Sequence, residues 1–238
     1  MRSFLVLLKK DFRMMVSGRF FLAAAGSLLL YTLFIQYIVS GNGLTQLKVL
    51  VGELLFIEIA AVRFLEIGSM LLKEKQMGVV RVHAVMPFQK RLFLLSKLTA
   101  FLLSDLLFAA GLTMLNAGGL EAAGIMPAVL LQTAVLSLLM ALAGFGCAML
   151  LQDFKQFSAA YAVIVAYAAV PVFMAQDPSG VAAWINWNPF YHIYRELKNA
   201  FFGIHCAGWV YYACTGCGIG VMFLLAQAAF YKEMGKEG

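Results

Sequence analysis

Long runs of apolar residues follow one another along the chain, separated by short polar connections. A helix needs about 20 predominantly apolar residues to cross the hydrocarbon core of a bilayer. Six runs are long enough, at 20–39, 50–72, 92–115, 127–151, 157–175 and 204–230. The pattern therefore predicts an all-α fold, a polytopic membrane protein with six transmembrane helices and no separate soluble domain.

The N-terminal segment, residues 1–19, has the pattern of an amphipathic helix, predicted over 4–15. One helical face carries Phe4, Leu5, Leu8, Phe12 and Met15, and the opposite face carries Arg2, Lys9, Lys10 and Arg13. Such a helix lies along the inner leaflet, with its apolar side in the lipid and its basic side toward anionic head groups. A solvated start to the first spanning helix is the alternative interpretation.

A second amphipathic helix is predicted within residues 176–203, before the last apolar run. Asn188 is expected to cap it, Pro189 to occupy its first turn and Gly203 to end it. Its apolar stripe consists of Phe190, Ile193, Tyr194, Leu197 and Phe201, with His192, Arg195, Glu196 and Lys198 on other faces. We expect this helix to lie on the outer leaflet or to dip into it.

Composition supports the membrane assignment. Hydrophobic residues make up 63% of the chain and charged residues only 13%, with a mean hydropathy of +0.86. A soluble domain contains about 25% charged residues. The net charge of +6 does not indicate nucleic-acid binding, because the basic residues gather at the ends of apolar runs rather than along one surface.

The distribution of Lys and Arg predicts the orientation in the membrane. Thirteen of the 18 basic residues lie in the N-terminal segment, the second and fourth connections and the C-terminal tail. Only three lie in the other connections, and two lie within runs. Because cytoplasmic segments carry the excess of Lys and Arg, both termini are predicted to be cytoplasmic.

Several ionisable residues fall inside apolar runs, where they are energetically costly and mark either ion pairs or a transport path. The second run contains Glu53, Glu58, Arg63 and Glu66, and the third contains Lys97 and Asp105. From their depths, estimated from the helical rise, we expect a Glu66–Lys97 ion pair and a contact of Arg63 with Asp105 or Glu58. A structural latch and a substrate or proton site both remain open for these residues.

The sequence lacks the motifs of common catalytic sites. It contains no G-x-x-x-x-G-K-[ST] stretch for binding ATP, no H-E-x-x-H zinc motif and no G-x-S-x-G nucleophile motif. Cys214 and Cys217 lie in an apolar run, where two small apolar thiols are expected rather than a redox or metal site. We therefore expect no enzymatic activity, no cofactor and no metal on this chain.

Residues 73–91, KEKQMGVVRVHAVMPFQKR, connect the second and third runs. A simple connection needs only a few polar residues, so the length of this one indicates a docking element. We expect a basic, partly apolar helix over 76–85 that is ended by Pro87. The side chains predicted to face a partner are Met77, Val79, Val80, Val82 and Val85.

This connection resembles the first cytoplasmic loop of ABC-2 type transporter permeases. The resemblance rests on Glu74, Gly78, the MPF sequence around Pro87, and Leu94 and Lys97 at the head of the next run. It extends over nearly the whole chain, through the amphipathic N-terminal helix, the six spans and the outer amphipathic segment. Within the family, the loop is most similar to permeases of small bacterial fluoroquinolone exporters.

The resemblance implies that residues 1–238 form one ABC-2 type transmembrane domain in the bacterial cytoplasmic membrane. Such a domain is the permease subunit of an ATP-driven exporter of amphiphilic or drug-like substrates. A second permease subunit, identical or homologous, would complete the path, and two copies of a separate ATPase would carry the ATP and magnesium. The coupling-loop residues would be Glu74, Gly78, Val82 and Pro87, and the buried charge pairs would involve Arg63, Glu66, Lys97, Asp105 and Glu58.

Two other functions remain as alternatives. The second run is more charged than is expected of these permeases, which favours an ion-coupled secondary transporter that uses the intramembrane acidic residues. An integral membrane enzyme or an assembly scaffold is a third hypothesis, without a specific motif in its support.

Overall fold

The computed structural model describes residues 2–17, 20–39, 44–79, 90–117, 119–174, 185, 188–204 and 208–235. Within these residues the chain forms eight helices: α1 (Arg2–Ser17), α2 (Phe20–Val39), α3 (Leu44–Gln76), α5 (Lys90–Ala117), α6 (Gly119–Leu150), α7 (Phe154–Met174), α8 (Pro189–Phe201) and α9 (Trp209–Gly235). The predicted all-α class is confirmed for this part of the chain.

Helix length and hydropathy make this a multi-pass membrane protein. Among the residues that the structure describes, four helices are long and apolar enough to cross a bilayer, over Leu92–Asn116, Ala122–Leu150, Phe154–Met174 and Trp209–Glu233. A fifth candidate is the bent pair Phe4–Ser17 and Leu22–Tyr37, whose axes meet at 61°. Helix α3 has 33 residues and is long enough to span, but Glu58, Arg63 and Glu66 interrupt its apolar middle.

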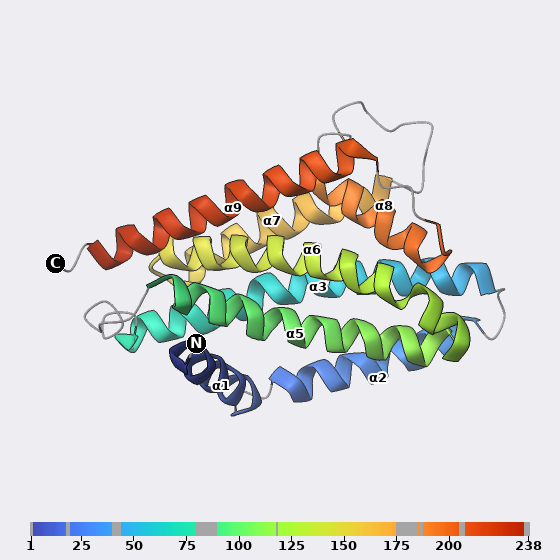
Figure 1. Cartoon of the computed structure of the whole chain (residues 1–238), viewed down its shortest axis with the longest axis horizontal. Coiled ribbons are helices and arrows are strands. Elements are labelled where there is room, and N and C mark those ends of the chain that lie inside the picture. The colour runs from blue at the N-terminus through green and yellow to red at the C-terminus, as the bar shows by residue number, and fades with distance from the viewer. Residues whose placement is uncertain are drawn as a thin grey trace.

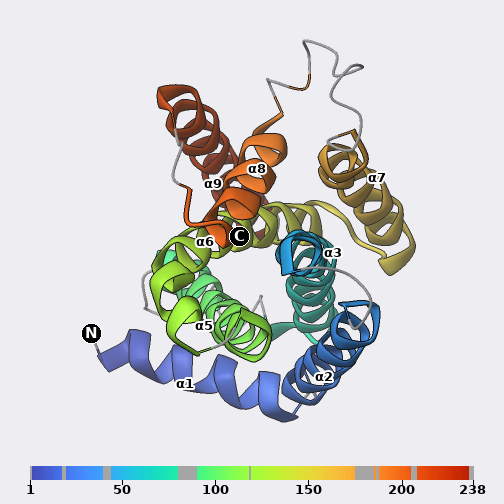
Figure 2. The same cartoon turned by 90° about the vertical axis from the view of Figure 1, so that its right-hand side faces the viewer.

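The long helices run up and down along the long axis of the molecule (Figure 1). One end gathers α1, the last turns of α3, the first turns of α5 and the C-terminal turns of α9, whereas α8 lies toward the opposite end. In the view along the axis, α3, α5 and α6 lie centrally and α7 lies at the periphery (Figure 2). Fully buried aromatic side chains fill the space between the helices, among them Phe56, Phe64, Phe101 and Phe145.

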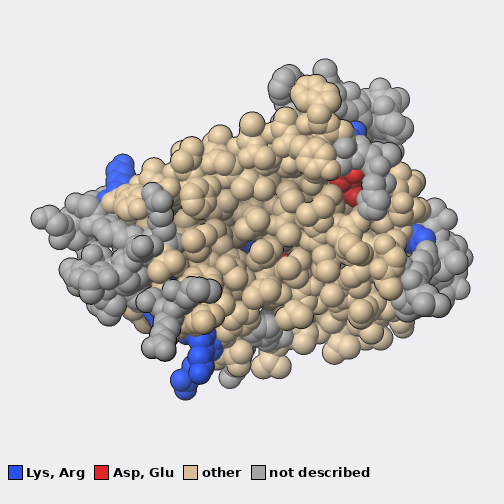
Figure 3. Space-filling model, in the orientation of Figure 1, with Lys and Arg blue, Asp and Glu red and all other residues tan. Residues whose placement is uncertain are grey.

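The outer surface of the bundle is apolar. Figure 3 shows a largely uncharged surface between the two ends of the molecule, with the visible Lys and Arg side chains mainly near the ends. Leu22, Val163 and Phe173 are 71%, 70% and 71% exposed. A contiguous apolar surface of this kind is rare on a protein in water and is suited to contact with lipid chains.

Close packing of α3 against α6 depends on a glycine. A Cβ atom added at Gly144 on α6 would lie 2.8 Å from the backbone oxygen of Phe64 and 2.7 Å from the side chain of Ile67. Because the Phe64 oxygen belongs to the backbone, a change of side-chain rotamer cannot make room for the added Cβ atom. Small residues allow membrane helices to approach closely in this way.

We therefore expect Gly144→Val to separate α3 from α6 and to lower the free energy of unfolding by about 1–3 kcal/mol, as overpacking does. Thermal unfolding of the purified protein in detergent would measure this. Gly216→Val is the matched control, because Gly216 lies on α9 with nothing within 4 Å of an added Cβ. An equal loss of stability in both variants would contradict the assignment of Gly144 as a packing residue.

Helix α8 begins and ends where the sequence predicts. The Asn188 side chain accepts a hydrogen bond of 2.9 Å from the backbone N–H of Phe190, and Pro189 is the first helical residue. Gly203, with φ of +69°, follows the last turn. A residue with positive φ at the end of a helix is usually glycine, because it has no Cβ atom to clash with the backbone.

The predicted division of α8 into an apolar stripe and outward-facing polar residues is wrong for two residues. His192 and Glu196, expected to face away from the apolar stripe, are each only 3% exposed. The reason is that α3, α6, α7 and α9 all pack against this short helix, so its polar faces are covered as well as its apolar one. Arg195 is exposed. Trp184 and Trp187 lie outside the described residues.

Three helices begin at least five residues away from the start of the predicted run. Helix α3 begins at Leu44 rather than residue 50, α6 begins at Gly119 rather than 127, and α9 begins at Trp209 rather than 204. Pro127 lies inside α6 instead of at its start. Proline is tolerated within membrane helices because neighbouring groups satisfy the freed carbonyl. Polar residues such as Thr45 and Lys48 extend α3 beyond its apolar run.

Candidate functional site

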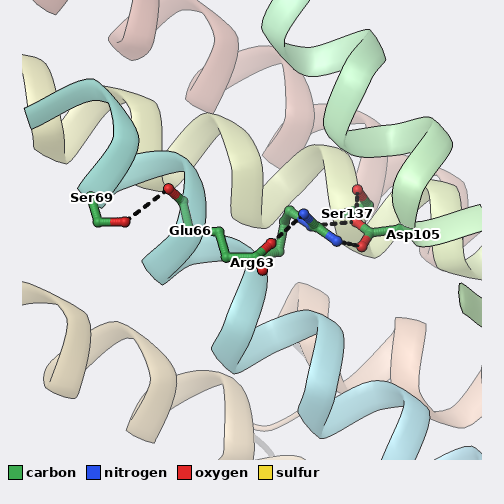
Figure 4. A network of polar contacts seen from close by, with 5 residues as sticks. All are labelled: Arg63, Glu66, Ser69, Asp105 and Ser137. Atoms are coloured by element: carbon green, nitrogen blue, oxygen red, sulfur yellow. Dashed lines mark hydrogen bonds and ion pairs between the residues drawn. The ribbon is translucent and has the colours of Figure 1, made fainter. Parts of the chain in front are cut away.

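A cluster of charged side chains lies in the middle of the bundle. Arg63 on α3 donates from Nε to Oδ2 of Asp105 on α5 at 2.8 Å, and its Nη2 also contacts Oδ1 of that carboxylate. Its Nη1 lies 2.5 Å from Oε2 of Glu66, one helical turn further along α3. Ser137 on α6 donates to Asp105, so three helices meet here (Figure 4). We refer to Arg63, Glu66, Asp105 and Ser137 as the Arg63 cluster.

The Arg63 cluster is shielded from solvent. Arg63 is 6% exposed and Asp105 is 1% exposed. The guanidinium carbon lies 5.1 Å from the ring centroid of Phe101, within the range of a cation–π contact. Because a planar guanidinium matches a carboxylate with two parallel contacts, the arrangement fixes α3 and α5 in one register.

Glu58 lies near this cluster but has a different partner. It accepts a hydrogen bond from the hydroxyl of Tyr31 on α2. A cavity of about 280 Å³ lies between α2, α3 and α5, and Glu58, Arg63, Glu66 and Asp105 all border it. Four of the six charged residues that were predicted inside the membrane therefore face a common space.

Of the pairs expected from the sequence, the Arg63–Asp105 contact is present and the Glu66–Lys97 pair is wrong. Glu66 contacts Arg63 instead, since a spacing of three residues places both on one side of α3. Lys97 lies on α5 nearer to the end of the bundle that holds α1, with other acidic partners.

A second cluster, Asp11, Glu74, Ser96 and Lys97, lies toward that end and is called the Lys97 cluster. Lys97 is 0% exposed, and its Nζ lies 3.1 Å from Oδ1 of Asp11 and 2.9 Å from Oε2 of Glu74. The Ser96 hydroxyl donates to Oδ2 of Asp11 at 2.7 Å. The ring centroid of Phe93 is 4.8 Å from the ammonium nitrogen. One cation thus joins α1, the last turns of α3 and the start of α5.

This arrangement changes the interpretation of Glu74. The family resemblance implies that it belongs to the coupling loop, and in the structure it is 1% exposed, with its carboxylate in contact with Lys97. Helix α3 continues to Gln76, past the predicted end at 72, and so carries Glu74 into the bundle. Gly78 follows the helix with φ of +71° and ends it. Val82 and Pro87 lie outside the described residues.

Lys75, next to Glu74, connects the same end of the bundle to two further helices. Its Nζ donates to the backbone oxygens of Met149 and Leu151 at 3.0 and 3.1 Å, and lies 2.8 Å from Oε1 of Glu233. The last carbonyls of a helix have no partner within it and carry partial negative charge. Lys75 therefore caps α6 and links it to α9.

The opposite end of the bundle has a separate polar contact. The Tyr194 hydroxyl on α8 donates to Oε1 of Glu53 on α3 at 3.0 Å. Burial, and then the nearby charge of Glu53, raise the pKa of Tyr194, so the hydroxyl stays protonated and remains a donor. Glu53 is thus held by α8 and lies apart from the cavity.

Three residues of the two clusters, Asp11, Ser96 and Ser137, were not identified from the sequence, and neither was Tyr31, the partner of Glu58. Asp11 carried a signal, because it is the one acidic residue of an otherwise basic helix. The hydroxyl residues Tyr31, Ser96 and Ser137 had no such signal, since hydroxyl groups are common in membrane helices. Among the described residues, no group of three or more His, Cys, Asp or Glu side chains could hold a metal ion.

Comparison with known proteins does not add to these observations. No family model matches the sequence, and no curated protein matches it either.

Proposed function

We propose that this chain is the membrane subunit of an ATP-driven exporter and that a separate ATPase supplies the energy. In this proposal α2, α3, α5, α6, α7 and α9 are six spans, and both termini are cytoplasmic. A second permease subunit completes the path for an amphiphilic substrate. The family resemblance of residues 73–91 and the absence of a P-loop support the dependence on an outside ATPase.

The observation that carries the proposal is the set of contacts around the ends of this loop. Glu74 and Lys75 lie at its start, in the last turn of α3, and Lys97 lies about two turns into α5, the helix that follows it. Through these three residues the two ends of the loop contact α1, the end of α6 and the end of α9. A force applied to the loop therefore acts on five helices rather than on two.

This connectivity is suited to a two-state machine. A ligand that binds far from the transport path shifts a conformational equilibrium only if it contacts the two states differently. An ATPase pair that closes on ATP would press on the loop and move the helices joined by Lys75 and Lys97 as one body. Rigid-body motion of packed helices is a common form of such transitions.

The docking role of the loop is testable with Val82→Asp. We expect this variant to insert into the membrane normally and to lose association with the ATPase, because a charge would replace an apolar docking contact. Co-purification of an ATPase subunit expressed together with this chain measures the outcome. Gln152→Asp is the matched control, because Gln152 is an exposed residue of the α6–α7 connection at the same end of the bundle.

Retained co-purification of Val82→Asp would refute the docking role. Transport in liposomes provides a separate test of the energy source. Transport should require both the ATPase and ATP, so a purified chain that moves substrate without them would overturn the exporter proposal.

An ion-coupled secondary transporter is the second candidate. The observation in its favour is the cavity bordered by Glu58, Glu66 and Asp105 with a single guanidinium among them. Intramembrane carboxyl groups beside a cavity are a common feature of proton and cation pathways. This candidate predicts transport that follows a proton or sodium gradient and continues when ATP is depleted.

A further inference from the structure

The cavity between α2, α3 and α5 contains more acidic than basic groups. Arg63 is its single guanidinium, and three of that group's nitrogens already contact Asp105 or Glu66. Glu58 has the neutral hydroxyl of Tyr31 as its partner. Three carboxyl groups thus share one cation in a region where uncompensated charge is costly. The electrostatics of the cavity favour a positively charged occupant.

A second observation points independently to an occupant. Ser104 on α5 borders the cavity, is 8% exposed, and makes no hydrogen bond to the described residues. Buried hydroxyl groups on helices usually donate to the carbonyl one turn earlier, as Thr113 and Thr215 do here. A buried polar group without a partner is uncommon in proteins. Ser104 therefore offers a hydrogen-bonding position to a molecule in the cavity.

The remaining lining identifies the kind of cation. Ile59, Val62 and Phe108 form apolar walls beside the carboxylates. A bare metal ion prefers a shell of several oxygen ligands, and no such group of side chains exists among the described residues. Apolar and aromatic walls next to carboxylates suit an organic ammonium group, which can also contact the face of a ring. The volume of about 280 Å³ limits the ligand to a small molecule.

We propose that this cavity binds a small organic cation, with its ammonium group between Glu58 and Glu66 and its apolar part against Ile59, Val62 and Phe108. Ser104 accepts a hydrogen bond from the ammonium N–H. Asp105 is held by Arg63 and Ser137, and so keeps the wall of the cavity in place. Binding at this site needs neither ATP nor an ATPase, so the inference stands apart from the proposed export activity.

The test is equilibrium binding of radiolabelled 2-phenylethylammonium to the purified chain in lipid nanodiscs, without nucleotide. We expect saturable binding at one site per chain. 2-Phenylethanol, which has nearly the same size but no charge, should compete at least about tenfold more weakly, because charge-assisted contacts are the stronger ones. If 2-phenylethanol displaced the probe as strongly as unlabelled 2-phenylethylammonium does, the proposal would be overturned.

Variants assign the binding to this cavity. Glu58→Gln and Glu66→Gln should each weaken binding about tenfold, the loss expected for one charge-assisted contact. Glu53→Gln is the matched control on the same helix and should bind normally, because Glu53 contacts Tyr194 outside the cavity. Ala24→Phe keeps every charge and should abolish binding by filling the space.

The Ala24→Phe variant also covers the case in which removal of a carboxylate disturbs folding. Normal binding by folded Ala24→Phe, or by both glutamine variants, would exclude this cavity as the site. An absence of saturable binding to the wild-type chain would overturn the inference altogether. None of these results depends on whether the protein transports a substrate.

Discussion

Lys97→Met is expected to lower the free energy of unfolding by about 3–5 kcal/mol, the range measured when one partner of a buried ion pair is removed. Lys97 is fully buried between two carboxylates from different helices. Without it, Asp11 and Glu74 would be two buried acidic groups with no cation between them. The loss would be measured from thermal unfolding in detergent, followed by the near-ultraviolet circular dichroism of the aromatic core.

Two further variants separate the charge from the side-chain volume. Lys73→Met removes an exposed lysine from the last turn of α3 and should leave stability nearly unchanged. The triple variant Asp11→Asn, Glu74→Gln, Lys97→Met removes all three charges together and should recover much of the loss, because no unpaired charge remains. If Lys97→Met and Lys73→Met were equally stable, the Lys97 cluster would have no structural role.

Arg63→Met is expected to lower the free energy of unfolding by a similar amount, again about 3–5 kcal/mol. Arg63 contacts Asp105 with two nitrogens and Glu66 with a third. Its removal would leave both carboxyl groups buried near Glu58 with no cation, and would release α5 from α3. Unfolding in detergent, measured in the same way, tests this expectation.

Arg63→Lys is the informative control for this position. Lysine keeps the charge, but a single ammonium cannot reproduce the two parallel contacts to Asp105 together with the contact to Glu66. We therefore expect a stability between those of the wild type and Arg63→Met. A lysine variant as stable as the wild type would show that charge alone, and not the geometry of the guanidinium, joins the helices.

The charged network was only partly predictable from the sequence. Helical rise gives the depth of each residue, and depth left Asp105 and Glu58 as alternative partners of Arg63, of which the structure contains the Asp105 contact. Depth does not tell which face of a helix a residue occupies. The spacing does: Arg63 and Glu66 are three residues apart and so lie on one side of α3, which favours the Arg63–Glu66 pair that the structure contains.

The secondary structure was more predictable than the packing. The cap and the stop of α8 follow from Asn188, Pro189 and Gly203, which are local signals. The burial of His192 and Glu196 on the same helix depends on four other helices, and no local signal reports it. Gly144 likewise has no feature that separates it from other glycines until α3 is placed against α6.

The position of Asp11 could not be predicted from the overall pattern of its helix. An amphipathic helix with a basic face is typical of a helix at the lipid surface, and α1 has that pattern. In the structure its acidic residue points into the bundle and contacts Ser96 and Lys97. A single residue that departs from the charge of its helix is therefore a better indicator of a tertiary contact than the overall pattern.

The position of Asp11 has a practical consequence for anyone who shortens or tags this protein for expression. A version that starts after residue 17 would lack the carboxylate that shares Lys97 with Glu74, together with the partner of the Ser96 hydroxyl. Low yield of such a truncation would then reflect a damaged helical bundle and not the loss of a membrane anchor. Affinity tags are better placed beyond α9, away from these contacts.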